Sequence, residues 1–314
     1  MNNEPAIAVT GLRKTYPPRG NAPAKEALKG IDLAVPRGSF FGLLGPNGAG
    51  KSTLINILAG VVMKTAGRAQ VWGIDLDADP ISLRRKIGIV PQELNLDPFF
   101  TPKEAMELQA GLWGVPSRSR RTMEILESVG LADKANAYAR SLSGGMRRRL
   151  LVAKAMVHSP PVLVLDEPTA GVDLELREQL WTMIRGLNRA GTTIVLTTHY
   201  LEEAQSLCDE IAIIGDGRVI AHDSTANLLA QMDDKAVAIT LSQDIDVLPE
   251  SLARFNAKLE SPRRIALRFR ARETAMESVL DALRAEGMSI ADISTREADL
   301  NDIFLRLTRE ARAA

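Results

Sequence analysis

The chain has 314 residues, of which 39 are Lys or Arg and 39 are Asp or Glu, so its formal net charge is zero. The broad basic surface of a general nucleic-acid binder is therefore not expected, and the length suits one large domain with a small one, or two domains. Its one cysteine, Cys208, has no second thiol with which to form an internal disulfide.

Membrane insertion and secretion are not expected from the sequence. The first residues, MNNEPAIAVT, lack the basic and long apolar segments of a secretion signal. The most apolar stretches, such as PVLVLDEP at 161–168, fall short of the about 20 apolar residues that a membrane helix needs. We therefore expect a cytoplasmic chain, and any work at a membrane would need a second protein that spans it.

The apolar runs along the first 230 residues predict an α/β fold. Strand-length aliphatic runs occur at 39–44, 86–92, 161–168 and 192–199, with helix-like segments between several of them. This alternation is typical of a largely parallel, buried sheet. Between 101 and 140 the spacing of apolar residues is helical throughout, which indicates an all-helical insertion at about 93–150.

A second, smaller domain is expected at 231–314. The segments 236–241 and 263–271 alternate like strands, 274–287 reads as an amphipathic helix that ends in glycine, 289–294 could be a third strand, and ADLNDIFLRLTRE a last helix. These elements predict a small α+β appendage, so the first domain would span 1–230.

A phosphate-binding loop is predicted at GPNGAGKST, residues 45–53, because it follows an apolar strand and precedes an apolar helix. Its glycines, Gly45, Gly48 and Gly50, allow backbone N–H groups to turn inward around phosphate oxygens. Lys51 would reach the β- and γ-phosphates, and the Ser52 hydroxyl would bind Mg²⁺. A chance glycine-rich turn is the alternative, and GTPases and small-molecule kinases carry the same loop.

Three further side chains stand at the ends of predicted strands. Asp166 and Glu167 end the run VLVLDEP, where Asp166 could hold Mg²⁺ through its water shell and Glu167 could act as general base on water. His199 ends TIVLTTH, where its imidazole could contact a γ-phosphate. The alternatives are a solvated start of a loop for the carboxylates and a structural hydrogen bond for the histidine.

The order of these motifs resembles that of the nucleotide-binding subunits of ABC transporters, over residues 5 to 225. The resemblance rests on Tyr16 in LRKTYPP, GPNGAGKST, Gln92 in VPQEL, LSGGM at 142–146, VLVLDEP, Asp173 in TAGVD and His199. It implies a P-loop NTPase core with a mostly parallel sheet and N-terminal antiparallel strands. It also implies binding of ATP and Mg²⁺, with hydrolysis of ATP.

The resemblance implies a role for each motif residue. Glu167, His199, Gln92 and Lys51 would be catalytic; Ser52, Gln92 and Asp166 would bind the metal; and Tyr16 would stack on adenine. The remaining nucleotide contacts would come from Gly45, Pro46, Asn47, Gly48, Ala49, Gly50, Thr53, Ser143, Gly144, Gly145 and Asp173.

The second glycine pair, in RSLSGGMRRRL, would serve the nucleotide of another subunit. Ser143, Gly144 and Gly145 would begin a helix whose N-terminus presents backbone donors to that subunit's γ-phosphate. The position of Met146 is usually occupied by glutamine, and this change leaves the backbone donors intact. We interpret the following basic run, Arg147–Arg149, as a solvated or salt-bridged helix face rather than a nucleic-acid site.

The resemblance is greatest to ATPases of bacterial drug, antibiotic and polysaccharide exporters, on the segments DEPTAGVD, TTHYLEEAQSLCDEIAIIGDGRVIAHDS and EADLNDIFLRLT. It implies a homodimer, or a dimer with a related ATPase, that drives an integral-membrane permease from the cytoplasmic side of the inner membrane. Gln92 would link γ-phosphate chemistry to the helical insertion that docks the permease. The alternative is a soluble ABC ATPase that acts as a regulator or nucleic-acid-associated switch without a permease.

Overall fold

The computed structural model describes residues 4–18, 20, 23–170, 172–198, 200–230, 234–270 and 276–296. The chain forms two compact units, Met1–Asp223 and Ser224–Ala314. The expected last helix, within 298–310, lies outside the described residues. The division expected after residue 230, as a boundary between parts that fold alone, stays a prediction.

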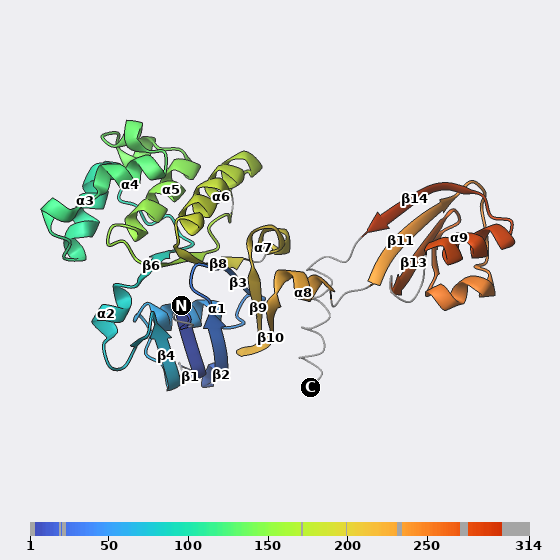
Figure 1. Ribbon diagram of the computed structural model, residues 1–314, viewed down its shortest axis with the longest axis horizontal. Helices are drawn as coiled ribbons and strands as arrows, with labels where there is room; N and C mark the ends of the chain where they lie inside the picture. Colours follow the sequence, from blue (N-terminus) through green and yellow to red (C-terminus); the bar gives the residue numbers. More distant parts are fainter. Residues whose placement is uncertain are drawn as a thin grey trace. The chain divides into compact units, whose positions relative to one another are not determined.

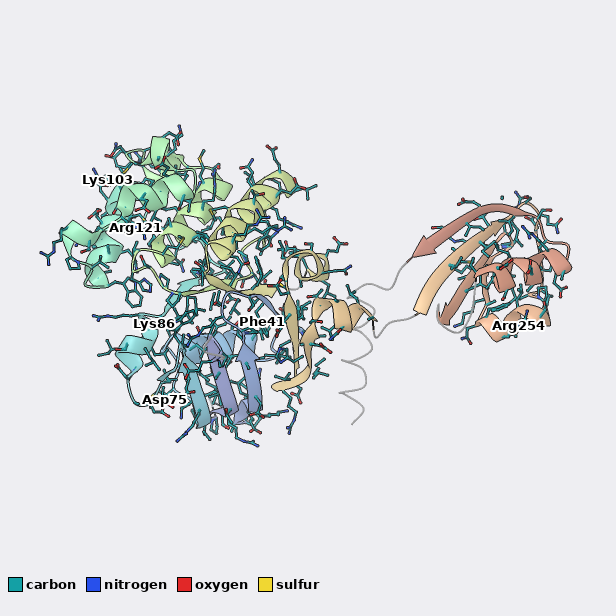
Figure 2. The ribbon with its side chains drawn as sticks, viewed as in Figure 1. Phe41, Asp75, Lys86, Lys103, Arg121 and Arg254 are labelled. Atoms are coloured by element: carbon teal, nitrogen blue, oxygen red, sulfur yellow. The ribbon has the colours of Figure 1, made fainter. Side chains whose placement is uncertain are left out.

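A six-stranded sheet forms the centre of the first unit, in the order β10-β9-β3-β8-β7-β6 (Figure 1). Strand β3 runs parallel to β8 and β9, and β7 runs parallel to β8 and β6. The strands span Phe40–Leu44 (β3), Ile87–Val90 (β6), Val162–Asp166 (β7), Thr193–Thr198 (β8), Glu210–Gly215 (β9) and Arg218–Ser224 (β10). These pairings confirm the mostly parallel sheet expected from the aliphatic runs. Strand β3, with the fully buried Phe41 (labelled in Figure 2), is covered on both faces, as is typical of parallel sheets.

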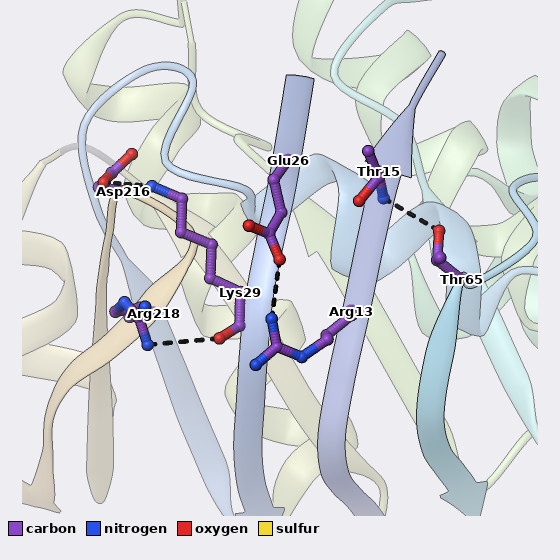
Figure 3. Close-up of polar contacts among 7 residues, drawn as sticks. All are labelled: Arg13, Thr15, Glu26, Lys29, Thr65, Asp216 and Arg218. Atoms are coloured by element: carbon purple, nitrogen blue, oxygen red, sulfur yellow. Dashed lines mark hydrogen bonds and ion pairs between the residues drawn. The ribbon is translucent and has the colours of Figure 1, made fainter. Parts of the chain in front are cut away.

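A four-stranded sheet, ordered β2-β1-β4-β5, is antiparallel throughout. Its strands span Ile7–Tyr16 (β1), Lys25–Val35 (β2), Ala66–Val71 (β4) and Ile74–Asp75 (β5). Cross-strand contacts between Arg13 and Glu26 and between Thr15 and Thr65 align the three longer strands (Figure 3). The register places Tyr16, at the end of β1, opposite Lys25 of β2.

Strand β2 is also fastened to the turn between β9 and β10. Lys29 pairs with Asp216 of that turn, and Arg218 donates to the Lys29 carbonyl (Figure 3). In the same turn, Gly217 N–H donates to the carbonyl of Ala49 at 2.9 Å. The antiparallel sheet and the β9–β10 turn therefore lie directly behind the loop that was predicted to bind phosphate.

The segment between β6 and β7 contains helices and no strand, as the sequence indicated. Its helices are α3 (Pro102–Leu112), α4 (Thr122–Ser128) and α5 (Gly144–Ala155), with 3-10 turns at Ser117–Ser119, Ala132–Lys134 and Ala139–Ser141. They pack around a core that includes Met106, Leu126 and Leu150. Thr101 begins α3 with a capping box, accepting from Glu104 N–H while the Glu104 carboxylate accepts from Thr101 N–H.

The remaining helices of the first unit connect strands. They are α1 (Lys51–Leu58), α2 (Pro80–Arg84), α6 (Leu174–Arg189) and α7 (Leu201–Leu207). Helix α6 packs beside α5, and Figure 1 shows α3 to α6 gathered together, away from β1, β2 and β4. No helix in the described part of the chain is both long enough and apolar enough to span a membrane.

The second unit is a small α+β structure. Helix α8 (Thr225–Ala230) precedes a sheet of β11 (Asp234–Leu241), β12 (Lys258–Ser261), β13 (Arg264–Arg270) and β14 (Ile290–Arg296), ordered β12-β13-β11-β14. Helix α9 (Met276–Ala285) and the 3-10 turn Glu250–Phe255 cover one face. Val279 and Leu283 of α9 pack with Val237 and Ile239 of β11, so this sheet has its own core. The sequence pattern did not indicate β12.

Candidate nucleotide site

The segment 45–50 turns between β3 and α1 and wraps the start of the helix. Gly50 caps α1 with φ of 115°, which only glycine adopts readily. A Cβ atom at Gly50 would lie 2.8 Å from the Ala27 carbonyl oxygen of β2, closer than Cβ atoms approach backbone atoms. The glycine is therefore required both by the turn and by the strand packed behind it.

A pocket of about 360 Å³ opens in front of this loop, within the range of roughly 300 to 1,000 Å³ of small-molecule sites. Its walls come from β1, β2, the phosphate loop, α1, and the ends of β6 and β7. The lining residues are Tyr16, Lys25, Ala27, Asn47, Gly48, Ala49, Gly50, Lys51, Ser52, Thr53, Gln92, Asp166 and Glu167. Most residues predicted for the nucleotide site thus meet in one cavity.

Lys51 folds back on the loop that precedes it. Its ammonium donates to the carbonyl oxygens of Gly45 at 2.6 Å and Pro46 at 3.2 Å, and the residue is only 6 % exposed. Burial lowers the pKa of Lys51, while the nearby charges of Glu167 and Asp166 oppose that shift. A polyanion in the pocket would supply the counter-charge that favours the ammonium form.

Asp166 and Glu167 diverge at the end of β7. The Asp166 carboxylate accepts from the Thr197 hydroxyl of β8 at 2.5 Å. Glu167 has a left-handed backbone, with φ of 45°, and its N–H donates to the carbonyl and hydroxyl oxygens of Thr197, each at 3.1 Å. This turn ends the strand and lets both carboxylates line the same pocket.

Gln92 is brought to Glu167 from the end of β6. Its side-chain amide donates to the Glu167 carboxylate at 3.1 Å, across 75 residues of sequence. Strands β6 and β7 are adjacent and parallel, so their carboxyl ends meet at one edge of the sheet. Gln92 can therefore respond to whatever occupies the space beside Glu167.

Tyr16 lies at another wall of the pocket. Its ring is half-buried, its hydroxyl lies 3.5 Å from the Thr53 hydroxyl, and the Lys14 ammonium lies 4.8 Å from the ring centroid. An aromatic face at the edge of a phosphate pocket offers a surface on which a base can stack.

The other motif residues do not line this pocket. Ser143 is the N-cap of α5 and accepts from Met146 N–H at 3.2 Å, while Asp173 is the N-cap of α6 and accepts from Leu176 N–H at 3.0 Å. Ser143 and Gly144 are exposed, and a Cβ at Gly144 would meet nothing within 4 Å. Gly145 is buried, and a Cβ there would lie 2.9 Å from Leu176 of α6.

His199, predicted to contact the γ-phosphate, lies outside the described residues. Its neighbours are held by a polar cluster in which the Thr198 hydroxyl donates to Glu203 at 2.9 Å and Tyr200 N–H donates to the same hydroxyl at 2.9 Å. The Arg177 guanidinium of α6 pairs with the Glu203 carboxylate at 3.5 Å.

The interpretation of Arg147–Arg149 as a solvated or salt-bridged face is wrong for Arg148. Arg148 is buried and donates to the carbonyl oxygens of Pro91 and Gln92. Arg147 donates to Leu142 O at 3.0 Å and Arg149 to Val129 O at 3.1 Å. Main-chain carbonyls, which carry no signal in the sequence, are the acceptors.

Three further residues, Lys25, Ala27 and Thr197, contribute to the pocket without having been expected from the sequence. Lys25 and Ala27 line it because β2 pairs with β1 beside Tyr16, and Thr197 holds the turn that carries both carboxylates. The sequence offered one indication of Thr197, a hydroxyl side chain within an apolar strand. The residues around Lys25 form no pattern that predicts a place in the pocket.

Comparison with known proteins agrees with this geometry. The ABC transporter family model matches residues 28–170. The Nod factor export ATP-binding protein I of Ralstonia nicotianae is 37% identical over 99% of this chain and 97% of its own length. The daunorubicin/doxorubicin resistance ATP-binding protein DrrA of Streptomyces peucetius is 36% identical over 98% of this chain and 94% of its own length.

Solved structures with the same fold include a dimeric ATP-binding cassette in a post-hydrolysis state with ADP and Pi. It is 30% identical, covers 70% of this chain and 98% of its own, and has a TM-score of 0.62. The structure of cbiO1 from Clostridium perfringens, part of the ABC transporter complex cbiONQ, is 28% identical over 73% of this chain and 92% of its own, with a TM-score of 0.65.

The parallel sheet and the pocket in front of its glycine loop define a P-loop ATPase. The chain belongs to the ABC transporter family, as an ATP-binding subunit.

Proposed function

We propose that two copies of this chain, or one copy with a related ATPase, close around two ATP molecules and drive a separate membrane permease for export. The observation that carries this proposal is the separation of the two glycine motifs. Residues 47–53 line the pocket, whereas Ser143 and Gly144 present an exposed helix N-terminus that does not. A second chain would bring its own α5 terminus to the open side of the pocket.

Within each pocket, the loop N–H groups and Lys51 would bind the phosphates, and Tyr16 would stack on adenine. The oxygen donors of Ser52, Asp166 and Gln92 suit Mg²⁺, which prefers oxygen ligands and keeps several waters. Held by these side chains, Mg²⁺ would supply the positive charge that offsets negative charge developing on the phosphates. Glu167 would accept a proton from the attacking water, with Gln92 holding its carboxylate in place. His199 is proposed to contact the γ-phosphate.

The opposite wall of each composite site would come from the partner's helix termini. The N-terminus of α5 has a Ser143 cap and exposed backbone at Gly144, and a helix N-terminus favours an anion. Asp173 and Leu174 begin α6 close by in the packed α5–α6 pair, and Leu174 is an apolar side chain 69% exposed. Burying this exposed apolar surface against a second copy would stabilise the dimer.

The permease is proposed to dock on a groove between the helical insertion and the sheet. A cavity of about 280 Å³ there is walled by Ile87, Ile89 and Trp113, with the cations of Arg84 and Lys154 beside them. Leu108 and Leu112 of α3 do not line this cavity and are exposed to solvent, with Leu112 75% exposed. An apolar helix of the permease with an acidic side chain would match both features.

The surroundings of Lys154 favour a permease helix that carries an acidic side chain. Burial lowers the pKa of Lys154, and no carboxylate pairs with it among the residues that the structure describes. An acidic side chain of the permease, placed in the groove, would stabilise this half-buried ammonium, which lacks a counter-charge. The groove also lies beside Pro91 and Asn95, which flank Gln92, so movement at the γ-phosphate would reach the docked permease.

Export from the cytoplasmic face of the inner membrane is supported by relatives whose names state export of Nod factor or resistance to daunorubicin and doxorubicin. The alternative of a regulator or nucleic-acid switch without a permease gains no support from the zero net charge or from this apolar groove.

The proposal is tested by purifying the tagged chain from detergent extracts of its host and identifying membrane proteins that accompany it. We expect a polytopic permease to co-purify with the wild type, and Leu112→Asp to lower its recovery about 10-fold or more, on the scale of a lost interface anchor. Val247→Asp is the matched control, because Val247 is 79% exposed in the second unit. Co-purification that survives Leu112→Asp would exclude docking against the exposed face of α3, and a wild type without any permease would favour the regulator.

A further inference from the structure

Arg148 joins the helix that carries the signature glycines to the loop that carries Gln92. Its Nη1 atom donates to Gln92 O at 2.6 Å and to Pro91 O at 3.3 Å, spanning 56 residues of sequence. The side chain is only 5% exposed. A guanidinium so placed fixes the backbone at Gln92 relative to α5, since a charged donor makes stronger hydrogen bonds than a neutral one.

A continuous series of contacts joins the signature glycines at the start of α5 to the Glu167 carboxylate of the same chain. Ser143 caps α5, Arg148 lies on the second turn of the same helix, and its guanidinium binds the Gln92 carbonyl. The Gln92 side chain then donates to the Glu167 carboxylate at 3.1 Å. A shift of α5 along its axis would therefore displace the amide that holds Glu167.

Burying the Arg148 guanidinium lowers the stability of the fold, which is a reason to look for a function of this side chain. No carboxylate pairs with Arg148 in the described ranges, and its Nε atom is buried without a hydrogen-bond partner there. A buried cation that is incompletely paired lowers stability, and such groups often serve a function instead. Neighbouring Arg149, by contrast, binds carbonyls of Val129 and Gly130, within the helical insertion itself.

We propose that Arg148 is a positioning residue, which holds Gln92 against Glu167 and transmits to Gln92 any movement of α5 when the signature binds a phosphate. This inference rests on the proposed dimer, in which α5 contacts the ATP of the partner. One ATP would then set the geometry of the catalytic residues at the other, so the two sites of a dimer would be coupled through one side chain in each chain.

Steady-state ATP hydrolysis by the full-length chain tests the positioning role. Arg148→Met keeps much of the side-chain length and removes every donor. We expect kcat to fall about 10- to 100-fold, the scale of a misplaced catalytic group, with KM for ATP changed less than about threefold. Arg148→Lys should restore part of kcat because it keeps one charged donor. Arg149→Met, the control on the same helix, should leave kcat within about threefold.

Amide hydrogen exchange of the segment 91–95, in which residues 92–95 carry exchangeable amides and Pro91 does not, gives a readout that does not depend on activity. Without nucleotide, exchange in this segment should be faster in Arg148→Met than in wild type, and unchanged in Arg149→Met, at equal melting temperature. In the Glu167→Gln background, ATP should slow exchange at 91–95 only when Arg148 is present.

The outcomes separate the positioning role of Arg148 from the coupling of the two ATP sites. Equal exchange at 91–95 in wild type and Arg148→Met, or equal loss of kcat in Arg148→Met and Arg149→Met, would overturn the positioning role. An ATP response at 91–95 that persists without Arg148 would overturn the coupling. If Glu167→Gln stays monomeric with ATP, the proposed dimer fails instead, and the nucleotide-free comparison still decides whether Arg148 holds the loop.

Discussion

Glu167→Gln is expected to retain ATP binding and to lose hydrolysis by about 10²- to 10⁴-fold, the contribution of a well-placed general base. The amide keeps the shape of the side chain, so the pocket and the turn at Thr197 should persist. It cannot accept a proton from the attacking water. Nucleotide binding by fluorescence titration and phosphate release by a coupled assay would separate the two effects.

The same variant should accumulate a dimer, because ATP that is bound and not cleaved keeps both composite sites closed. Size-exclusion chromatography with ATP and Mg²⁺ should show a species of twice the 34.1 kDa monomer mass, which disperses with ADP. Glu93→Gln is the matched control, since Glu93 is an exposed carboxylate next to Gln92 that does not line the pocket. Normal turnover in Glu167→Gln would exclude Glu167 as the base.

Lys51→Ala should abolish hydrolysis and weaken nucleotide binding together. Lys51 is the buried cation of the pocket, and its two present acceptors are carbonyls of the loop, which phosphate oxygens would replace. Loss of a preorganised charge of this kind costs about 3 to 4 kcal/mol of transition-state stabilisation. Lys25→Ala, which removes another lysine from the same pocket, should have a smaller effect. Near-normal turnover in Lys51→Ala would contradict the assignment of the loop.

The phosphate loop could be predicted from sequence because its determinants are local. The glycines, Lys51 and Ser52 lie within nine residues between a strand and a helix, and the structure places them as that pattern requires. The meeting of Gln92 with Glu167 could also be expected, since both end strands of one parallel sheet.

Contacts to main-chain atoms and between distant strands could not be predicted in this way. Arg148 was misinterpreted because its acceptors are backbone carbonyls at Pro91 and Gln92, which any residue supplies. Thr197 was missed because its role depends on the pairing of β7 with β8. Buried hydrogen bonds of this kind are fixed by the fold as a whole and leave no spacing pattern in the sequence.

The shared site is tested most directly by mixing two inactive chains. Ser143→Arg should block hydrolysis by obstructing the α5 terminus, and Lys51→Ala should block it in the phosphate loop. If the signature serves the partner's nucleotide, a heterodimer of these two chains places both lesions in one site and leaves the other intact.

We therefore expect ATPase activity to return when the two inactive proteins are combined, at up to about half the wild-type rate per dimer if the sites act independently. The control is a heterodimer of wild type with a chain that carries both Ser143→Arg and Lys51→Ala. It contains the same two substitutions, but both are in one chain. If the verified heterodimer of Ser143→Arg and Lys51→Ala stays inactive while that control hydrolyses ATP, the signature acts within its own chain and the shared-site account is contradicted.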